Sequence, residues 1–275
     1  MPFSAANLVA TLELTLAAVG AVLLWRLVIG PAARARSTGP RLAPWQASLP
    51  EFFVFILCVL GGSVLVAAAA SLLLRQLELR GDAATVVSGA ATQLGMLAGV
   101  LFHRSRTGSA ATAQSGGGNI FVAGAATFLM CLPVMLVTAA VWERVLQFAG
   151  LPVERQDLIA MFANAESPWL LVVMITLAVA IAPLTEEFVF RAGLFRFLRT
   201  RIPRWLALAA PALFFACLHV NWNTLQGLSS LAPLAVLAVL FSLAYERTGQ
   251  IGTAIVAHAL FNLNTIALIF SGVGL

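Results

Sequence analysis

The chain has 275 residues, of which 61% are hydrophobic and only 10% are charged. A soluble domain carries about 25% charged residues, so the composition argues against a soluble protein and predicts an integral, all-α membrane protein. The formal charge of +5 does not indicate a nucleic-acid partner, because the basic residues, all of them arginines, lie in short connections between apolar runs.

About eight apolar runs approach the roughly 20 residues with which a helix crosses a bilayer. We predict a polytopic bundle with transmembrane helices at 7–29, 52–74, 84–102, 119–142, 168–190, 205–220, 230–245 and 251–270. The first run lacks a preceding basic segment and a following cleavage site, so we interpret it as a retained span. Cys58, Cys131 and Cys217 lie in apolar runs without zinc-type spacing, and we expect them to be small buried hydrophobes.

The arginines orient the predicted spans. They are concentrated in the odd connections, as at Arg34, Arg36 and Arg41 in the first and at 196–204 in the fifth. The even connections hold fewer arginines and carry compensating acids. By the positive-inside rule, the odd connections are therefore predicted to be cytoplasmic and both termini to lie outside.

A Ser/Gly-rich stretch at 108–118 predicts a flexible cytoplasmic loop. It divides the chain into two expected parts. Residues 1–118 would form N-terminal transmembrane helices with no recognisable site, and residues 119–275 would form a transmembrane core that holds all of the candidate chemistry.

Two adjacent carboxylates, Glu186 and Glu187, stand inside the fifth run, with Arg191 four residues after the second. A charge near the centre of a membrane helix costs about 2.5–3.5 kcal/mol on insertion scales, so a chain that keeps two carboxylates there is expected to use them. Glu187 and Arg191, at i and i+4, predict an ion pair on one helix face. Glu186 lies about 100° around the helix and has no such local partner, which leaves it free to act as a general base.

Two of the three histidines also lie in apolar runs. Phe215 and His219 are at i and i+4, and His258 and Asn262 repeat that spacing, so that imidazole and amide project from one face. With the glutamates they supply the groups needed to activate a water and stabilise an oxyanion. We expect Phe215 to pack against His219, and the third histidine, His103, to be interfacial.

Each feature has a structural alternative. The Glu–Arg pair could be a structural ion pair, and a membrane histidine or an asparagine such as Asn262 often makes only a helix–helix hydrogen bond. The gathering of these groups in one half of the chain favours a shared site.

These residues resemble the CPBP family of intramembrane proteases, which is named for CAAX-protein and bacteriocin processing and is also called Abi-like. The family's three motifs, E-E-x-x-x-R, F-x-x-x-H and H-x-x-x-N, correspond in order to Glu186-Glu187…Arg191, Phe215…His219 and His258…Asn262. The resemblance covers about residues 165–265 and includes the segment 245–249. Ala192 departs from the family, which commonly has glycine there, and Gly193 follows it.

The resemblance implies a membrane-embedded endopeptidase that acts on peptide or lipidated protein substrates in the bilayer. The implied roles are water activation by Glu186 with His219, fixation of Glu187 by Arg191, and oxyanion binding by His258 with Asn262. The best-known members remove a C-terminal tripeptide from prenylated CAAX proteins. Bacterial relatives with the same motifs are linked to bacteriocin immunity or surface-protein processing, so the motifs do not define the substrate, and the oligomeric state is equally undefined.

Metal dependence stays open in the sequence. Glu186, His219 and His258 are acceptable zinc ligands, and the family has often been called a metalloprotease family. The pattern nevertheless lacks the H-E-x-x-H spacing that places two histidines one turn apart. We favour a Glu/His-activated water without a cofactor, with zinc as the alternative.

Two other functions compete with the protease. A non-proteolytic immunity or scaffold protein of the same fold would not need all of the polar residues, and a proton-relaying transporter would show inverted repeats and polar residues in both halves. The protease hypothesis predicts a cavity among the last four helices. It also predicts a multi-pass protein of the bacterial inner membrane, with a site that opens toward the cytoplasm or the bilayer.

Overall fold

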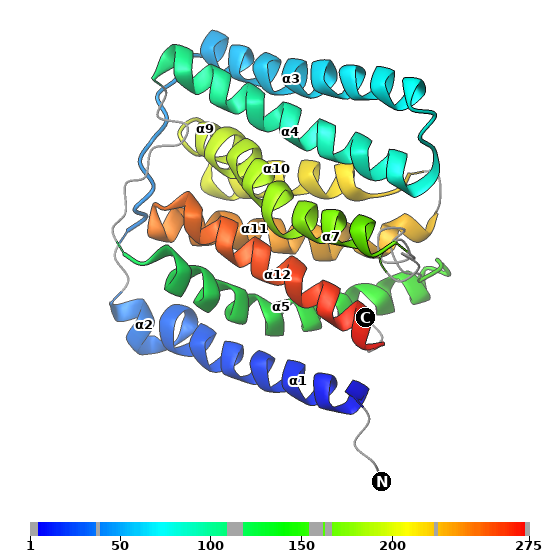
Figure 1. Cartoon of the computed structure of the whole chain (residues 1–275). Helices are drawn as coiled ribbons and strands as arrows, with labels where there is room; N and C mark the ends of the chain where they lie inside the picture. Colours follow the sequence, from blue (N-terminus) through cyan, green and yellow to red (C-terminus); the bar gives the residue numbers. More distant parts are fainter. Residues whose placement is uncertain are drawn as a thin grey trace.

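The computed structural model describes residues 5–36, 39–108, 118–153, 162, 167–222 and 225–272, and its regular elements are helices (Figure 1). In chain order these are α1 (Ala5–Leu24), η1 (Trp25–Ile29), α2 (Pro31–Ala35), α3 (Leu49–Gln76), α4 (Gly81–Thr107), α5 (Ile120–Phe148), α7 (Pro168–Thr176), η3 (Leu177–Ile181), α8 (Ala182–Glu186), η4 (Glu187–Phe195), α9 (Arg196–Arg199), α10 (Arg204–His219), η5 (Leu225–Ser230), α11 (Leu231–Thr248) and α12 (Ile251–Ser271). Most of the loop predicted at 108–118 lies outside the described residues.

Seven helical stretches in the described part of the chain are long and apolar enough to cross a membrane. They are Ala6–Ala35, Leu49–Gln76, Gly81–Thr107, Ile120–Phe148, Pro168–Arg199, Gly227–Thr248 and Ile251–Ser271. The eighth, α10, is a shorter apolar helix. These findings confirm the predicted all-α, polytopic membrane fold. At 1.5 Å per residue α10 is only about 24 Å long, less than the roughly 30 Å hydrocarbon core.

Several helices begin at side-chain caps. Ser48 Oγ accepts a hydrogen bond from the Glu51 amide at 3.3 Å, and Asn119 Oδ1 accepts one from the Phe121 amide at 2.9 Å. Such caps satisfy amides that have no partner within the helix. They explain why α3 begins a few residues before the predicted span, since capping rather than hydropathy sets the first turn.

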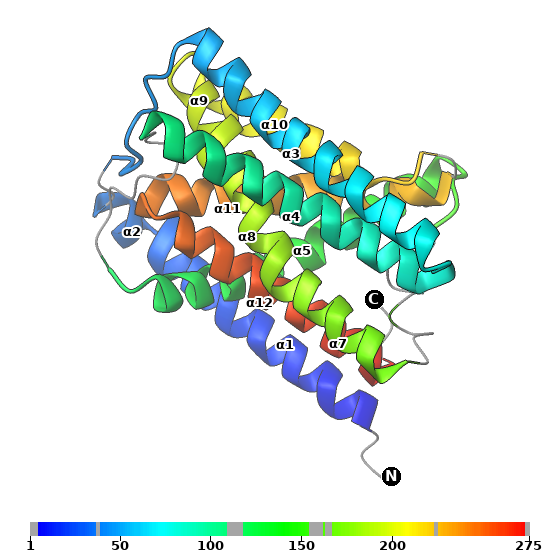
Figure 2. The ribbon, with the colours of Figure 1, turned by 45° about the horizontal axis from the view of Figure 1, so that its top comes forward.

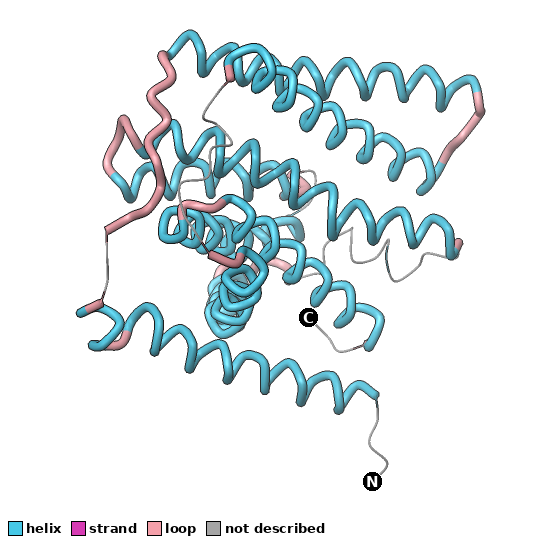
Figure 3. Tube along the Cα trace, turned by 60° about the vertical axis from the view of Figure 1, so that its left-hand side comes forward, coloured by secondary structure: helices cyan, strands magenta, loops and turns pink. Residues whose placement is uncertain are grey.

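The helices are arranged as a stack (Figures 1 and 2). The α3–α4 hairpin lies along one edge and α1 along the opposite edge, with α5, α11 and α12 between them, and the tube in Figure 3 shows the same separation. Helix α1 begins and α12 ends at the same end of the bundle (Figure 1). The assignment of that end to the outside of the cell stays a prediction.

The first and fifth connections bind each other at the opposite end of the bundle. Arg196 Nε donates to the Ala43 carbonyl at 2.7 Å, and Arg201 donates to the carbonyls of Trp45 and Ala47. Glu246 pairs with Arg199 and Arg204, each at 2.6 Å. The arginines read from the sequence as orientation signals therefore also hold the segment between α2 and α3 in place.

His103 is buried beneath that segment. Its ring lies edge-on to Phe55 and Trp45, with centroids 5.3 and 6.4 Å away, and only 1% of the residue is exposed. The expectation of an interfacial histidine was wrong, because hydropathy gave no sign that the polar first connection folds over the end of α4. The three cysteines are free, with Cys131 buried and the other two partly exposed.

Helices α3 and α4 pack with their backbones in contact. A Cβ at Gly62 would lie 2.3 Å from the Gly95 carbonyl oxygen, and a Cβ at Gly99 would lie 2.1 Å from the Cys58 carbonyl oxygen. Small residues four apart allow this approach between membrane helices. The contact fixes the part of α4 that carries Gln93.

Replacement of Gly99 by alanine is therefore expected to destabilise the protein by about 1–3 kcal/mol, the usual range for overpacking. The new methyl group meets backbone, which no side-chain rotation can relieve. Gly89→Ala is the matched control, because a Cβ at this position of the same helix would have no neighbour within 4 Å, and alanine should stabilise the helix there by up to about 1 kcal/mol. The free energy of unfolding in detergent distinguishes the two variants, and equal values for both would contradict this account of the helix pair.

Candidate active site

The two adjacent carboxylates lie at the junction of α8 and η4, inside the Pro168–Arg199 span. This span contains two π-helical stretches, η3 and η4, in place of one continuous α-helix. Such widened turns often occur at functional sites. Glu186, Glu187 and Arg191 are all buried. Of the two residues at the departure from the family pattern, Ala192 is fully buried and Gly193 lies against the Phe55 ring.

Glu187 is held by two partners. Its Oε1 lies 3.0 Å from Arg191 Nη1 and 2.9 Å from His258 Nδ1, and none of the Glu187 side chain is exposed. Arg191 lies over the rings of Phe215 and Phe241, at 4.9 and 5.7 Å from their centroids. A buried carboxylate needs ion-pair or hydrogen-bond partners to offset its loss of hydration, and Glu187 has two. The Glu187–Arg191 ion pair that the i, i+4 spacing predicted is therefore present.

Glu186 faces both histidines. Its Oε1 lies 3.8 Å from His219 Nε2, and its Oε2 lies 3.9 Å from His258 Nε2. These distances are too long for direct hydrogen bonds. Gaps of this size between polar atoms are where a bridging water is expected.

The contact that each histidine makes through Nδ1, away from Glu186, determines which ring nitrogen carries the hydrogen. His219 Nδ1 lies 2.7 Å from the Phe215 carbonyl oxygen, which can only accept, so Nδ1 carries a hydrogen. His258 Nδ1 faces the Glu187 carboxylate in the same way. In each neutral ring the lone pair is then on Nε2, the nitrogen that faces Glu186. As expected, Phe215 packs against His219, with ring centroids 4.2 Å apart.

His219 is the exposed member of the cluster. The His219 side chain is 37% exposed, whereas that of Glu186 is 9% exposed. Neighbouring side chains on α10, Phe214 and Leu218, are large, apolar and exposed. The surface next to His219 is therefore apolar, as suits contact with lipid.

Asn262 points at the backbone of η3. Its Nδ2 donates to the Ala178 carbonyl oxygen at 2.7 Å. In this turn the Ala182 N–H donates to the Leu177 carbonyl oxygen, and the next residue, Pro183, has no N–H group. The Ala178 carbonyl is thus left without a helical donor, and Asn262 supplies one. One of the two amide hydrogens of Asn262 is therefore committed to holding the span that carries the glutamates.

Asn262→Ala is expected to destabilise the protein by about 1–3 kcal/mol, because it leaves a partly buried carbonyl unpaired. In a Pro183→Ala background the restored amide can bond Ala178, so the same substitution should cost clearly less. Unfolding free energies of the wild type, both single variants and the double variant give the coupling. Additive effects would show that Asn262 does not compensate for the proline.

Gln93 is the site residue that sequence reasoning missed. It comes from α4, in the half of the chain expected to carry no site, and its Nε2 donates to Glu186 Oε1 at 3.0 Å. A glutamine within the apolar run 84–102 was the available signal. It carries no charge and belongs to none of the three motifs, so it did not stand out.

Within the described ranges, no group of three or more His, Cys, Asp or Glu side chains is arranged to hold a metal ion. His219 and His258 face different oxygens of Glu186, unlike ligands gathered around a tetrahedral zinc.

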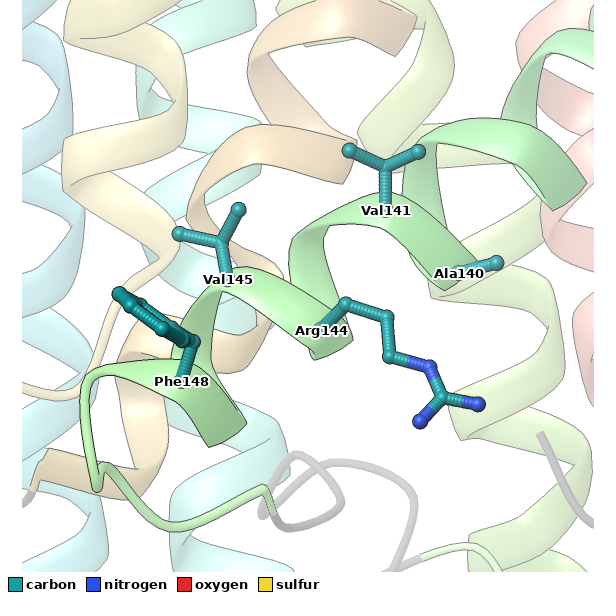
Figure 4. A pocket seen from close by; sticks show the side chains of 5 residues that line it. All are labelled: Ala140, Val141, Arg144, Val145 and Phe148. Atoms are coloured by element: carbon teal, nitrogen blue, oxygen red, sulfur yellow. The ribbon is translucent and has the colours of Figure 1, made fainter.

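Two cavities lie away from the cluster. The larger, about 600 Å³, is on the outer face of α5 and is lined by Ala140, Val141, Arg144, Val145 and Phe148 (Figure 4). The smaller, about 140 Å³, lies between the first connection and α9. Neither is enclosed by the last four helices, where the cavity was predicted.

The fold and the cluster define a polytopic helical membrane protein with a buried Glu/His site. Residues 168–264, about a third of the chain, match the family model described as type II CAAX prenyl endopeptidase Rce1-like. This range carries an Rce1-like domain and includes all six candidate residues, which confirms the resemblance drawn from the motifs. No curated protein and no solved structure matches the chain. The domain comes from a family of membrane endopeptidases.

Proposed function

We propose that the protein is an intramembrane endopeptidase that hydrolyses membrane-associated or lipidated protein substrates with a water activated by Glu186 and His219. The observation that carries this proposal is the 3.8 Å gap between Glu186 Oε1 and His219 Nε2. Both atoms are acceptors when the imidazole is neutral, so a water between them would donate a hydrogen to each.

In the proposed reaction the water oxygen attacks the scissile carbonyl carbon while its proton passes to Glu186. The C–N bond of the tetrahedral intermediate then breaks, and the same proton is returned to the leaving nitrogen. Placement of the water and carbonyl in one site supplies part of the rate enhancement through orientation.

His258 and Asn262 are proposed to stabilise the oxyanion. His258 can donate from Nε2 when its ring carries both hydrogens, and Glu187 Oε1 lies 2.9 Å from Nδ1 on the other side of the ring. Asn262 retains one amide hydrogen beyond the one given to Ala178. Arg191 balances the charge of Glu187, so that Glu187 orients His258 without itself exchanging a proton.

The exposed apolar face of α10 beside His219 supports entry of the substrate from the bilayer. A lipid anchor would hold the peptide close to this face of α10. Location in a bacterial inner membrane, a site on the cytoplasmic side and a division of the chain at residue 118 are parts of the same proposal.

Cleavage is expected to be independent of added metal. Purified protein in nanodiscs, treated with a zinc chelator and then dialysed, should cut a farnesylated quenched peptide at the rate of the untreated protein. Loss of activity after chelation, with recovery on adding zinc, would instead assign Glu186, His219 and His258 as ligands.

A further inference from the structure

Gln93 links the candidate site to a helix outside the matched domain. It lies on α4, and its Nε2 donates to Glu186 Oε1 at 3.0 Å, the shortest contact that this carboxylate makes with a described side chain. Its partner, Glu186, is the residue that takes the proton from water in the proposed function. A role for Gln93 in catalysis therefore rests on that proposed function.

The position of Gln93 is fixed by its surroundings. Its backbone carbonyl accepts a hydrogen bond from Thr185 Oγ1 at 3.4 Å, so α4 contacts both Thr185 and the adjacent Glu186. Two residues further along α4, Gly95 packs directly on Gly62 of α3. The amide is therefore presented to the carboxylate by a helix that is held on both sides.

This hydrogen bond determines which lone pairs of Glu186 are available. It occupies one acceptor site of Oε1 and restricts rotation of the carboxylate, so that Oε1 keeps facing His219 and Oε2 keeps facing His258. A glutamine cannot exchange protons with its neighbour, so its donor role is the same whether Glu186 is charged or protonated.

The other end of the amide is unpaired. Gln93 Oε1 is buried and has no hydrogen-bond partner among the described residues. Buried acceptors without partners are rare and call for an explanation other than packing. In the proposed reaction the attacking water and the peptide N–H of the substrate are donors that arrive at this place.

We propose that Gln93 is a positioning residue for the cleavage reaction, because it holds the Glu186 carboxylate in the orientation that activates the water. It acts through Glu186, so its removal should slow the chemical step more than it weakens substrate binding.

The test uses Gln93→Leu and Gln93→Met, two variants that keep bulk on an apolar helix and remove the amide. With a farnesylated quenched peptide that the wild type cleaves in nanodiscs, kcat should fall about 10- to 100-fold, as for loss of a hydrogen bond to a charged group. KM should change less than about threefold if binding is unaffected. Thr92→Val is the matched control, since its hydroxyl bonds the Ser88 carbonyl of its own helix.

Glu186→Gln separates failure of this inference from failure of the proposed function. In that background Gln93→Leu should cause no further loss, because the carboxylate that Gln93 positions has been replaced by an amide that cannot take a proton. Wild-type kcat in both Gln93 variants, or a loss expressed only in KM, would overturn the positioning role while leaving the protease proposal intact. Full activity of Glu186→Gln itself would overturn the proposed function.

Discussion

Glu186→Gln should lower kcat for peptide cleavage by about 10²- to 10⁴-fold, the usual contribution of a general base. Glutamine keeps the size of the side chain and can still accept from Gln93, but it cannot take a proton from water. His219→Ala should cause a loss of the same order, because it removes the second acceptor facing the gap. Steady-state kinetics of the purified variants in nanodiscs measure both effects.

The double variant tests whether the two residues share one water. Glu186→Gln combined with His219→Ala should be no slower than the slower single variant, since groups that act as a unit are strongly non-additive. Glu13→Gln serves as the control, because Glu13 is a carboxylate of α1 that accepts from Asn264 at 3.1 Å, away from the site. Multiplicative losses, or an equal loss in the control, would contradict the shared-water arrangement.

Arg191→Met should destabilise the protein by about 3–5 kcal/mol, the cost of leaving one member of a buried ion pair alone. Glu187, with none of its side chain exposed, would keep only His258 as a partner. The loss of the cation over Phe215 and Phe241 adds to the effect. The free energy of unfolding in detergent or bicelles gives the value.

Removal of both charges should be better tolerated than removal of one. Glu187→Gln in the Arg191→Met background leaves no unpaired charge, so much of the stability should return. Arg204→Met is the control, because Arg204 is 39% exposed and its partner Glu246 keeps Arg199. It should cost no more than about 1 kcal/mol. An Arg191→Met variant as stable as this control would show that the pair does not hold the site.

The confirmed predictions rested mainly on the long apolar runs and on the helical spacing of the charged residues. The spans followed from the length of bilayer that a helix must cross, and the contact between Glu187 and Arg191 followed from their separation by one turn. Both are local properties of a chain, so no knowledge of tertiary packing was needed.

The contacts that could not be predicted join distant parts of the chain. Gln93 reaches Glu186 across 93 positions, and Asn262 reaches Ala178 across 84. The burial of His103 depends on a polar connection folding over it. The orphaned Ala178 carbonyl could have been suspected from Pro183, but its partner depends on how α12 packs against η3.

The proposal as a whole depends on peptide hydrolysis at Glu186. The most direct measurement is mass spectrometry of the products formed in ¹⁸O-labelled water from a membrane-anchored peptide library, with purified protein in nanodiscs. We predict that the wild type releases fragments whose new carboxyl termini carry solvent oxygen and that Glu186→Gln releases them at least about 10²-fold more slowly. Release of the same fragments by Glu186→Gln at the wild-type rate, or none from the wild type with either lipidated or unlipidated peptides, would contradict this proposal.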